Sequence, residues 1–377
     1  MKVQQLSWRT AGSWQPRVGD LDGLAPQLVL VFGGRHLLER GQGLDDLRQR
    51  FPSAHHVIGS TSGEIVDTEV SEDTIAATAI AFEKTRVQSA GTRVSGSGES
   101  YDAGRRLAAD LTAADTELVH VFVVSDGALV NGTELARGFN EHLPAGVLLT
   151  GGLAGDGTRF ERTVVGLNQR PEPGWIAAVG FYGRSLGVRF GSAGGWEAFG
   201  PSRVVTRSEG NTLFELDGQS ALALYRTYLG DQAAQLPASA LRFPLAVTPG
   251  AEQTVVRTIL SIDDAAQSMT FAGDIPMHAR VRFMRASYED LIDGAAAAAD
   301  QARSDREADL VVCVSCVGRR IVLGQRTEEE TESVRAAVGA RPILTGFYSY
   351  GELAPATNSA ATQLHNQTMT ITSLFEA

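Results

Sequence analysis

The sequence has few cysteines, no long apolar run and no strongly basic segment. Two cysteines in 377 residues exclude a disulfide framework. No apolar run approaches the ~20 residues of a membrane-spanning helix, and the first residues lack the apolar core of a signal peptide. Lys and Arg number 33 against 44 Asp and Glu, a net charge of −11 without basic clusters, so neither nucleic acid nor a membrane surface is an expected partner. These absences predict a cytoplasmic protein.

The composition that remains is that of a folded, globular chain. Hydrophobic residues make up 43% and charged residues 20%, so most of the chain can bury a core. At ~150 residues per domain, the length predicts two or three domains. Forty-one glycines against 13 prolines indicate many tight turns between strands and loops.

One pattern recurs three times along the chain: an apolar strand, a helical stretch, a second strand and a Gly-rich loop followed by an acid. The copies span residues 27–64, 118–156 and 310–352, and each precedes a further apolar strand, at 74–82, 174–182 and 367–374. A strand, helix and strand in succession form a parallel crossover, and the trailing strand can join the sheet edge. The sequence therefore predicts an α/β fold with mixed, mostly parallel sheets flanked by helices, built from repeated β-α-β-loop-β units in two lobes.

The domain organisation follows from a change in composition and pattern between the second and third copies. Residues 194–276 are punctuated by Pro and Gly and contain a helix candidate at 221–229 and strands near 255–260 and 268–271. We expect an N-terminal leader over residues 1–26, a first domain over 27–220 and a second over 221–377.

Cys313 and Cys316 form a C-x-x-C pair inside an apolar strand. A structural zinc site needs about four ligands, and the sequence supplies neither a second such pair nor paired histidines. A redox pair would sit at a helix N-terminus, whereas strand alternation directs these two side chains to opposite faces. Cys313 is therefore expected to be a buried thiol, and Cys316 to lie near a crevice at the strand end, beside Arg319 and Arg320.

Other polar residues suggest competing chemistries. Glu64, Asp156 and Glu352 follow the three Gly-rich loops, where we expect them to accept backbone N–H bonds, with paired acid catalysis as the alternative. His365 and Asn366 begin a run of four polar residues directly before an apolar strand, which makes them site candidates. A thiol hydrolase or transferase built from Cys316, His365 and Glu352, with Arg319 binding an anionic substrate, is a further alternative.

Several motifs taken together resemble those of the FIST proteins, named for F-box and intracellular signal transduction. The resemblance covers residue 27 to the end and rests on residues 58–65, 151–157, 315–320, 346–352 and 365–368. It implies a FIST-N part followed by a FIST-C part, a sensory rather than enzymatic module that binds a small ligand and signals to kinases, cyclic-nucleotide enzymes or chemotaxis receptors. Because no output domain is present, the expectation is a stand-alone sensor acting on a separate protein such as a histidine kinase.

The family offers two kinds of ligand. Some members resemble haem-binding nitric-oxide sensors, for which His365 would be the haem ligand. Others are proposed to bind amino acids or similar metabolites; here Arg319 or Arg320 would hold a carboxylate, and Tyr348 and Tyr350 would supply hydroxyls and ring faces, one facing the crevice and the other the core. The expected ligand-binding residues are Cys316, Arg319, Arg320, Tyr348, Tyr350, Glu352, His365 and Asn366.

Overall fold

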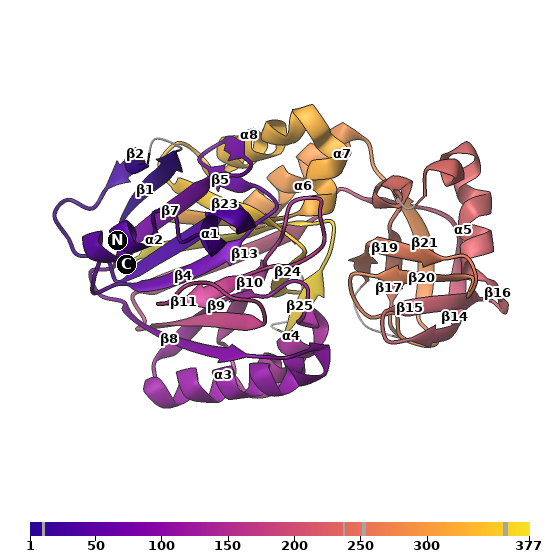
Figure 1. Ribbon diagram of the computed structural model, residues 1–377, viewed down its shortest axis with the longest axis horizontal. Coiled ribbons are helices and arrows are strands. Elements are labelled where there is room, and N and C mark those ends of the chain that lie inside the picture. The colour runs from indigo at the N-terminus through magenta and orange to yellow at the C-terminus, as the bar shows by residue number, and fades with distance from the viewer. Residues whose placement is uncertain (10–11, 237, 251–253, 357–360) are drawn as a thin grey trace.

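The structure is a computed structural model that describes residues 1–9, 12–236, 238–250, 254–356 and 361–377. It consists of a large body and a small β-rich lobe that is inserted into the body by two connections (Figure 1). Three six-stranded sheets form the body, and a further sheet of eight strands forms the lobe. None of the described helices combines the length and the apolar character needed to cross a membrane.

The three repeated copies predicted from the sequence each form a parallel β-α-β unit. Their strand pairs are β3 (Leu28–Gly33) with β4 (His55–Ser60), β9 (Leu118–Ser125) with β10 (Leu148–Leu153), and β22 (Leu310–Cys316) with β23 (Ile343–Ser349). The helices between them are α1 (Arg35–Glu39) and α2 (Leu44–Arg50), then α4 (Gly132–Asn140), and finally α7 (Val317–Leu323) and α8 (Thr327–Val338). We refer to these as the first, second and third units.

The expectation of mostly parallel sheets is wrong, because each unit contributes one parallel pair and its other neighbours run antiparallel. The trailing strands β7 (Ile75–Ala81), β12 (Trp175–Tyr182) and β26 (Met369–Glu376) pair antiparallel with the first strand of their units. Beyond them lie β1 (Lys2–Arg9), β8 (Arg86–Arg93) and β13 (Leu186–Ala193). Residues 1–26, expected to be a leader, thus supply β1, and also β2 (Ser13–Asp20), which pairs with it.

The units exchange short strands in a closed cycle. The loop that follows the second strand of each unit continues into another unit's sheet: β5 (Glu64–Val66) pairs with β23, β24 (Gly351–Pro355) with β10, and β11 (Val165–Leu167) with β4. Two hairpin partners, β6 (Glu69–Ser71) and β25 (Thr362–His365), extend this pattern. The three loops are therefore brought together at the centre of the body.

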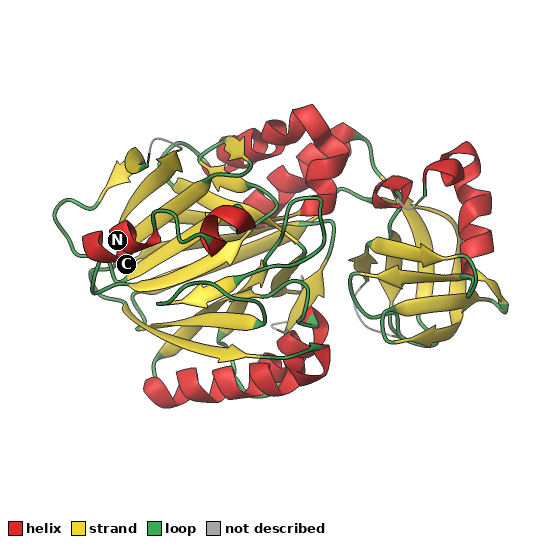
Figure 2. Ribbon diagram, in the orientation of Figure 1, coloured by secondary structure: helices red, strands yellow, loops and turns green. Residues whose placement is uncertain are grey.

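The core of the body lies where the inner faces of the three sheets meet. Along each first strand, alternate residues point inward, as with Leu28, Leu30 and Phe32, while the residues between them pack under the helices. Strands apolar on both faces are typical of sheets that are covered on both sides. The outer cover consists of α1 and α2 on the first sheet, α3 (Ser100–Ala114) and α4 on the second, and α6 (Tyr288–Gln301) and α8 on the third (Figure 2).

The lobe spans residues 197–285 and curls around its own apolar core. Its long strand β14 (Glu197–Glu209) pairs with β21 (Arg280–Arg285) along one part and with β15 (Thr212–Leu216) along another. The remaining elements are β16 (Gln219–Ser220), α5 (Ala221–Leu229), β17 (Leu245–Thr248), β18 (Val255–Arg257), β19 (Ile259–Asp263) and β20 (Ser268–Phe271). The boundary expected at residue 221 falls inside this lobe, at the start of α5.

Candidate functional site

The three loops that follow the second strands interlock through equivalent backbone hydrogen bonds. Ser62 N–H donates to Tyr348 O (2.8 Å), Tyr350 N–H to Leu153 O (3.1 Å), and Gly155 N–H to Ser60 O (2.9 Å). This cycle aligns the three units residue by residue, and it creates three equivalent junctions. Each junction lies between the loop after the first strand of one unit and the loop after the second strand of the next.

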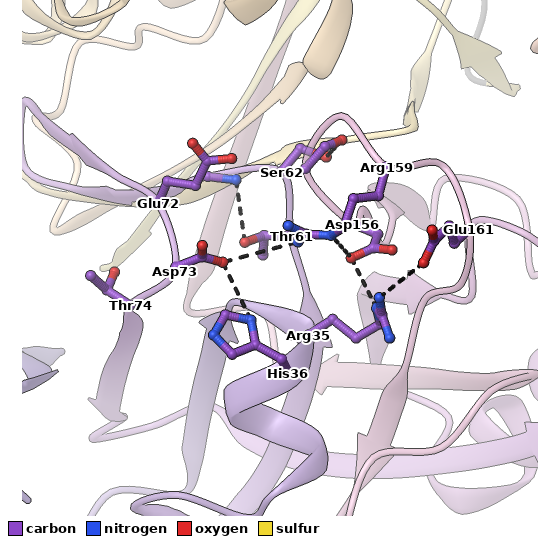
Figure 3. Close-up of polar contacts among 12 residues, drawn as sticks. Arg35, His36, Thr61, Ser62, Glu72, Asp73, Thr74, Asp156, Arg159 and Glu161 are labelled. Carbon is purple, nitrogen blue, oxygen red and sulfur yellow. Dashed lines mark hydrogen bonds and ion pairs between the residues drawn. The ribbon is translucent and has the colours of Figure 1, made fainter. Parts of the chain in front are cut away.

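The junction between the first and second units is filled by ion pairs (Figure 3). Nε of Arg35 and Nε of Arg159 lie 2.9 and 2.8 Å from the same oxygen of Asp156, a fully buried carboxylate. At its edge, Nδ1 of His36 lies 3.4 Å from Asp73. Both guanidinium groups lie on Oδ1 of this carboxylate, while Oδ2 has no hydrogen-bond partner among the described residues. The two ion pairs fill this junction with the protein's own side chains.

The junction between the third and first units is also filled. The Arg320 side chain donates to the carbonyl of Ser62 and to Glu72, the latter at 3.0 Å. Beneath it, Tyr348 Oη donates to Glu330 at 2.6 Å. The polar groups at this junction therefore have partners within the protein.

The junction between the second and third units is open. By the register, Gly127 occupies the position that Arg35 holds in the first unit, and a Cβ on Gly127 would lie 2.0 Å from Ala154 O. No side chain fits there, and a cavity of about 510 Å³ remains, walled on one side by the body and on the other by the lobe. We call it the interlobe cavity; its wall consists of Ser97, Gly127, Ala128, Val130, Asn131, Gly132, Leu153, Phe160, Glu161, Cys316, Val317, Gly318 and Tyr350 of the body and Asn211, Leu241, Thr258, Leu260, Phe271, Ala272, Gly273 and Asp274 of the lobe.

An aromatic pair forms part of the body wall. The rings of Phe160 and Tyr350 stack with centroids 4.8 Å apart and planes 18° apart. The Tyr350 hydroxyl accepts from Phe160 N–H (3.1 Å) and donates to Gly157 O (3.3 Å), which fixes the pair on the loop of the second unit. Burial raises the pKa of Tyr350 to about 12, so the ring stays neutral.

Of the eight residues expected to bind ligand, the structure places Cys316 and Tyr350 on the cavity wall. Tyr348, two residues from Tyr350, points to the opposite side and is fully buried, which confirms that one tyrosine faces the crevice and the other the core. Cys313 and Cys316 likewise lie on opposite faces of β22, with Cys313 packed under α6 and α8.

Arg319 serves the fold rather than a ligand, which corrects the expectation that it holds a carboxylate. It is fully buried and paired with Glu330 at 2.8 Å. Its other donors reach the carbonyls of Gly194 (2.7 Å) and Leu291 (2.6 Å). Gly194 starts the connection into the lobe and Leu291 lies just after the connection back, so Arg319 anchors both. Arg320 is also committed internally, as described above.

Glu352 accepts hydrogen bonds within its loop, as expected of the acids that follow the Gly-rich loops. Ser349 Oγ donates to it at 2.6 Å, and the hydroxyl and N–H of Thr368 donate at 3.0 and 3.3 Å. Burial raises its pKa to about 8. Glu64 repeats this arrangement in the first unit, with Thr61 and Thr74 as donors, and its pKa is raised by burial to about 7.

The residues His365 to Gln367 lie where the lobe meets the body. His365 Nε2 is 3.1 Å from Ala354 O, and burial lowers the pKa of this imidazole to about 4. Asn366 donates to His365 O (3.0 Å). The carbonyl of Gln367 accepts from Trp196 Nε1 (2.8 Å), and its side chain donates to Leu241 O of the lobe (3.1 Å). This polar run thus fastens the base of the lobe.

His365 and Cys316 differ in placement and ionisation from a haem ligand and an activated thiol, respectively. A haem ligand needs a free imidazole nitrogen facing a cavity, whereas His365 Nε2 is engaged and none of the described cavity residues is a histidine. Burial, reinforced by the Glu352 carboxylate, raises the pKa of the Cys316 thiol, the opposite of what activates a nucleophile. Within the described residues, no group of His, Cys, Asp and Glu side chains has the arrangement of a metal site.

The lobe wall was missed by the sequence analysis. Asp274, Thr258 and Ala272 carry no motif, and the lobe shows no copy of the repeated unit. The one available signal was the changed texture of residues 194–276, which marks an insertion between the second and third units.

Sequence comparison matches residues 27–219 to the FIST N domain and residues 221–355 to the FIST C domain. A comparison with curated protein sequences gives no match. Among solved structures, the chain is similar to a chorismatase (TM-score 0.36, 12% identity) and to a cyanuric acid hydrolase (TM-score 0.34, 10% identity), in each case over 100% of this chain and 98% of the other. Similarity at this level does not indicate a shared activity.

Proposed function

This chain belongs to the FIST family of sensory and signalling domains, and we propose that it is a sensor whose small-molecule ligand occupies the interlobe cavity. The signal passes to a separate output protein, such as a histidine kinase. An amino acid or a similar metabolite is the class of ligand that the family suggests. We propose binding, and not catalysis, as the function of this site.

The observation that carries this proposal is a cavity with one wall on the body and the other on the lobe. A ligand shifts a conformational equilibrium only by as much as its affinities for the two states differ. Contacts to both walls are made fully only when the lobe lies against the body. A ligand in this cavity therefore favours the closed arrangement.

The attachment of the lobe supports such a shift. In the described part of the chain, three side-chain hydrogen bonds link lobe and body: Asn131 to Asp274 (3.4 Å), Arg257 to Leu364 O (2.9 Å) and Gln367 to Leu241 O (3.1 Å). The first connection contains Gly195, whose φ of 74° favours glycine. Arg319 and Gln367 hold the base of the lobe, so the movement that we propose is a small tilt of the lobe about this base.

The test is a ligand screen on a cavity-blocked variant. Ala272→Trp places an indole in the interlobe cavity, while Ala265→Trp places one on an exposed turn of the same lobe. We expect a panel of amino acids and small metabolites to contain a compound that raises the melting temperature of the wild type and of Ala265→Trp but not of Ala272→Trp. A compound at 100 times its Kd stabilises by about 2.7 kcal/mol.

Two results contradict the proposal. One is a ligand that stabilises Ala272→Trp as strongly as the wild type, because it then binds outside the cavity. The other is a stable Soret band after haemin addition that shifts with nitric oxide, because it identifies a haem sensor.

A further inference from the structure

The charged side chains on the wall of the interlobe cavity are acidic. They are Glu161 on the body and Asp274 on the lobe, and none of the described wall residues is Lys, Arg or His. Glu161 lies at the outer edge, where Arg35 approaches it at 3.4 Å (Figure 3). The protein as a whole carries a net charge of −11. A cation is therefore attracted toward the cavity, and an anion is not.

Asp274 is the acid that remains available to a ligand. Its carboxylate accepts one long hydrogen bond, from Asn131 Nδ2 at 3.4 Å, and no ion pair to it occurs in the described part of the chain. Arg257 lies behind this wall, packed against Gly273, and its positive charge interacts with Asp274 without forming an ion pair. Its Nε donates to the Asp274 carbonyl (3.2 Å) and its Nη1 to the Leu364 carbonyl (2.9 Å). By contrast, the buried Asp156 in the equivalent filled junction has two arginines.

Thr258, near Asp274, gives a second and independent indication of a ligand with N–H donors. Its side chain is 4% exposed, and its hydroxyl oxygen has no hydrogen-bond partner although the residue lines the cavity. Ala272 N–H donates to Thr258 O (2.9 Å), so the segments carrying Thr258 and Asp274 run side by side. A buried polar atom without a partner costs free energy, which a hydrogen bond from a ligand removes. Hydroxyl and carboxylate oxygens together suit a ligand with several N–H donors.

The cavity wall also carries exposed apolar side chains. Phe160, stacked on Tyr350, and Leu260 on the lobe are each 45% exposed, and both lie on the cavity wall. An aromatic face attracts a cation as well as a flat apolar group. The wall therefore suits a ligand with a charged end and a planar or apolar body.

We propose that the interlobe cavity binds an organic cation: an ammonium or guanidinium group held by Asp274 and Thr258, joined to an apolar or aromatic body that packs against Phe160. This assignment rests on the proposed function, because it takes the cavity to be the ligand site. It replaces recognition of a carboxylate by Arg319 or Arg320 with recognition of a positive charge by the lobe.

The test is calorimetric titration of the full chain with three probes of one shape: 2-phenylethylamine, phenylalanine and 3-phenylpropanoate. We expect the amine to bind and the carboxylate not to bind. Asp274→Asn should weaken binding of the amine at least tenfold, because it removes the charge while keeping the side-chain shape. Glu209→Gln, which removes one charge from an exposed position of the same lobe, should leave binding unchanged.

The outcomes separate this inference from the proposed function. If 3-phenylpropanoate or phenylalanine binds while the amine does not, and Ala272→Trp abolishes that binding, the cavity is a ligand site but the cation assignment is wrong. If the amine binds equally to the wild type and to Ala272→Trp, it binds outside the cavity. That result would contradict both the cavity as the binding site of this amine and the assignment of an organic cation to the cavity. Equal weakening by Asp274→Asn and Glu209→Gln would mean that only overall charge matters, which also overturns the inference. If none of the three probes binds, an aryl-substituted ammonium is not the ligand and the assignment is overturned as stated.

Discussion

Two buried carboxyl groups should make the stability of this protein fall as the pH rises. Glu352 and Glu64 occupy equivalent positions in the third and first units, and both are buried. In each, a hydroxyl three residues earlier and the threonine before the trailing strand donate to the carboxyl group. Burial raises their pKa from the ordinary 4.5 to about 8 and about 7 because it disfavours the ionised form.

The perturbation is Glu352→Gln. Above pH 4.5 the unfolded chain releases a proton that the folded protein keeps until its own pKa is reached. The stabilisation is thus complete below the unfolded pKa and is lost as the pH rises toward the folded value, with a slope of about 1.4 kcal/mol per pH unit for one group. From pH 5 to pH 7, the variant should therefore lose about 3 kcal/mol less of its unfolding free energy than the wild type does.

A neutral amide fits the same hydrogen bonds. Its oxygen can accept from Thr368, and its NH₂ can donate to Ser349 if that hydroxyl rotates. The assay is urea denaturation at pH 5, 6, 7 and 8, with Glu332→Gln, an exposed acid on α8, as the control. Parallel curves of unfolding free energy against pH for the wild type and Glu352→Gln would refute the reasoning, since they would mean that Glu352 is ionised in the fold at pH 5.

Two further predictions concern buried groups near the lobe. Arg319→Met should lower the free energy of unfolding by about 3–5 kcal/mol, since it leaves the Glu330 carboxylate buried without its cation. In urea denaturation, Arg326→Met, which removes two surface ion pairs, to Glu289 and Glu329, should change this free energy little, and equal effects of the two variants would contradict the role of Arg319. In a Cys313→Ala background, Cys316 should react with a thiol reagent at pH 7 far more slowly in the folded protein than in the urea-unfolded chain, because burial raises the pKa of its thiol. The reaction is followed by absorbance. Equal rates in the folded and unfolded chains would contradict this prediction, because they would show an accessible, activated thiol.

The individual strands and helices were predictable from the sequence because each produces a short, local pattern of apolar residues. The helix expected at 221–229 is α5, and each repeated copy contains the helical stretch expected between its two strands. The three parallel pairs followed from the repeated unit. Apolar alternation with a period of two, and helix-forming stretches between strands, are local signals that tertiary contacts did not override.

The assembly of the sheets was not predictable in this way. The exchanged strand β5 has three residues, as does β11, and each pairs with a strand far away in the sequence. Strands this short carry little periodicity, and nothing local states which unit they join. Most neighbours in each sheet come from such exchanges and from trailing strands, which is why the expectation of mostly parallel sheets was wrong.

Asp156, the acid after the second Gly-rich loop, shows that the same Gly-acid motif does not guarantee the same position in the fold. Asp156 follows Gly155 as Glu64 follows Gly63, but the backbone register places Asp156 level with Gly63, one position earlier than Glu64. It therefore points to the junction with the first unit and takes Arg35 and Arg159 as partners. A one-residue offset changes which face a side chain occupies, and only the register reveals it.

The location of the cavity follows from the same alignment. Three equivalent junctions exist, and a large cation closes a junction where the backbone leaves room for it, as with Arg35. At Gly127 the carbonyl of Ala154 leaves no room for a Cβ, so this junction lacks the side chain that Arg35 supplies in the first unit. The inserted lobe covers this junction and supplies the second wall. A fold of three similar units thus keeps one open junction, and two of the residues that we propose for its ligand, Asp274 and Thr258, come from the part of the chain that does not repeat.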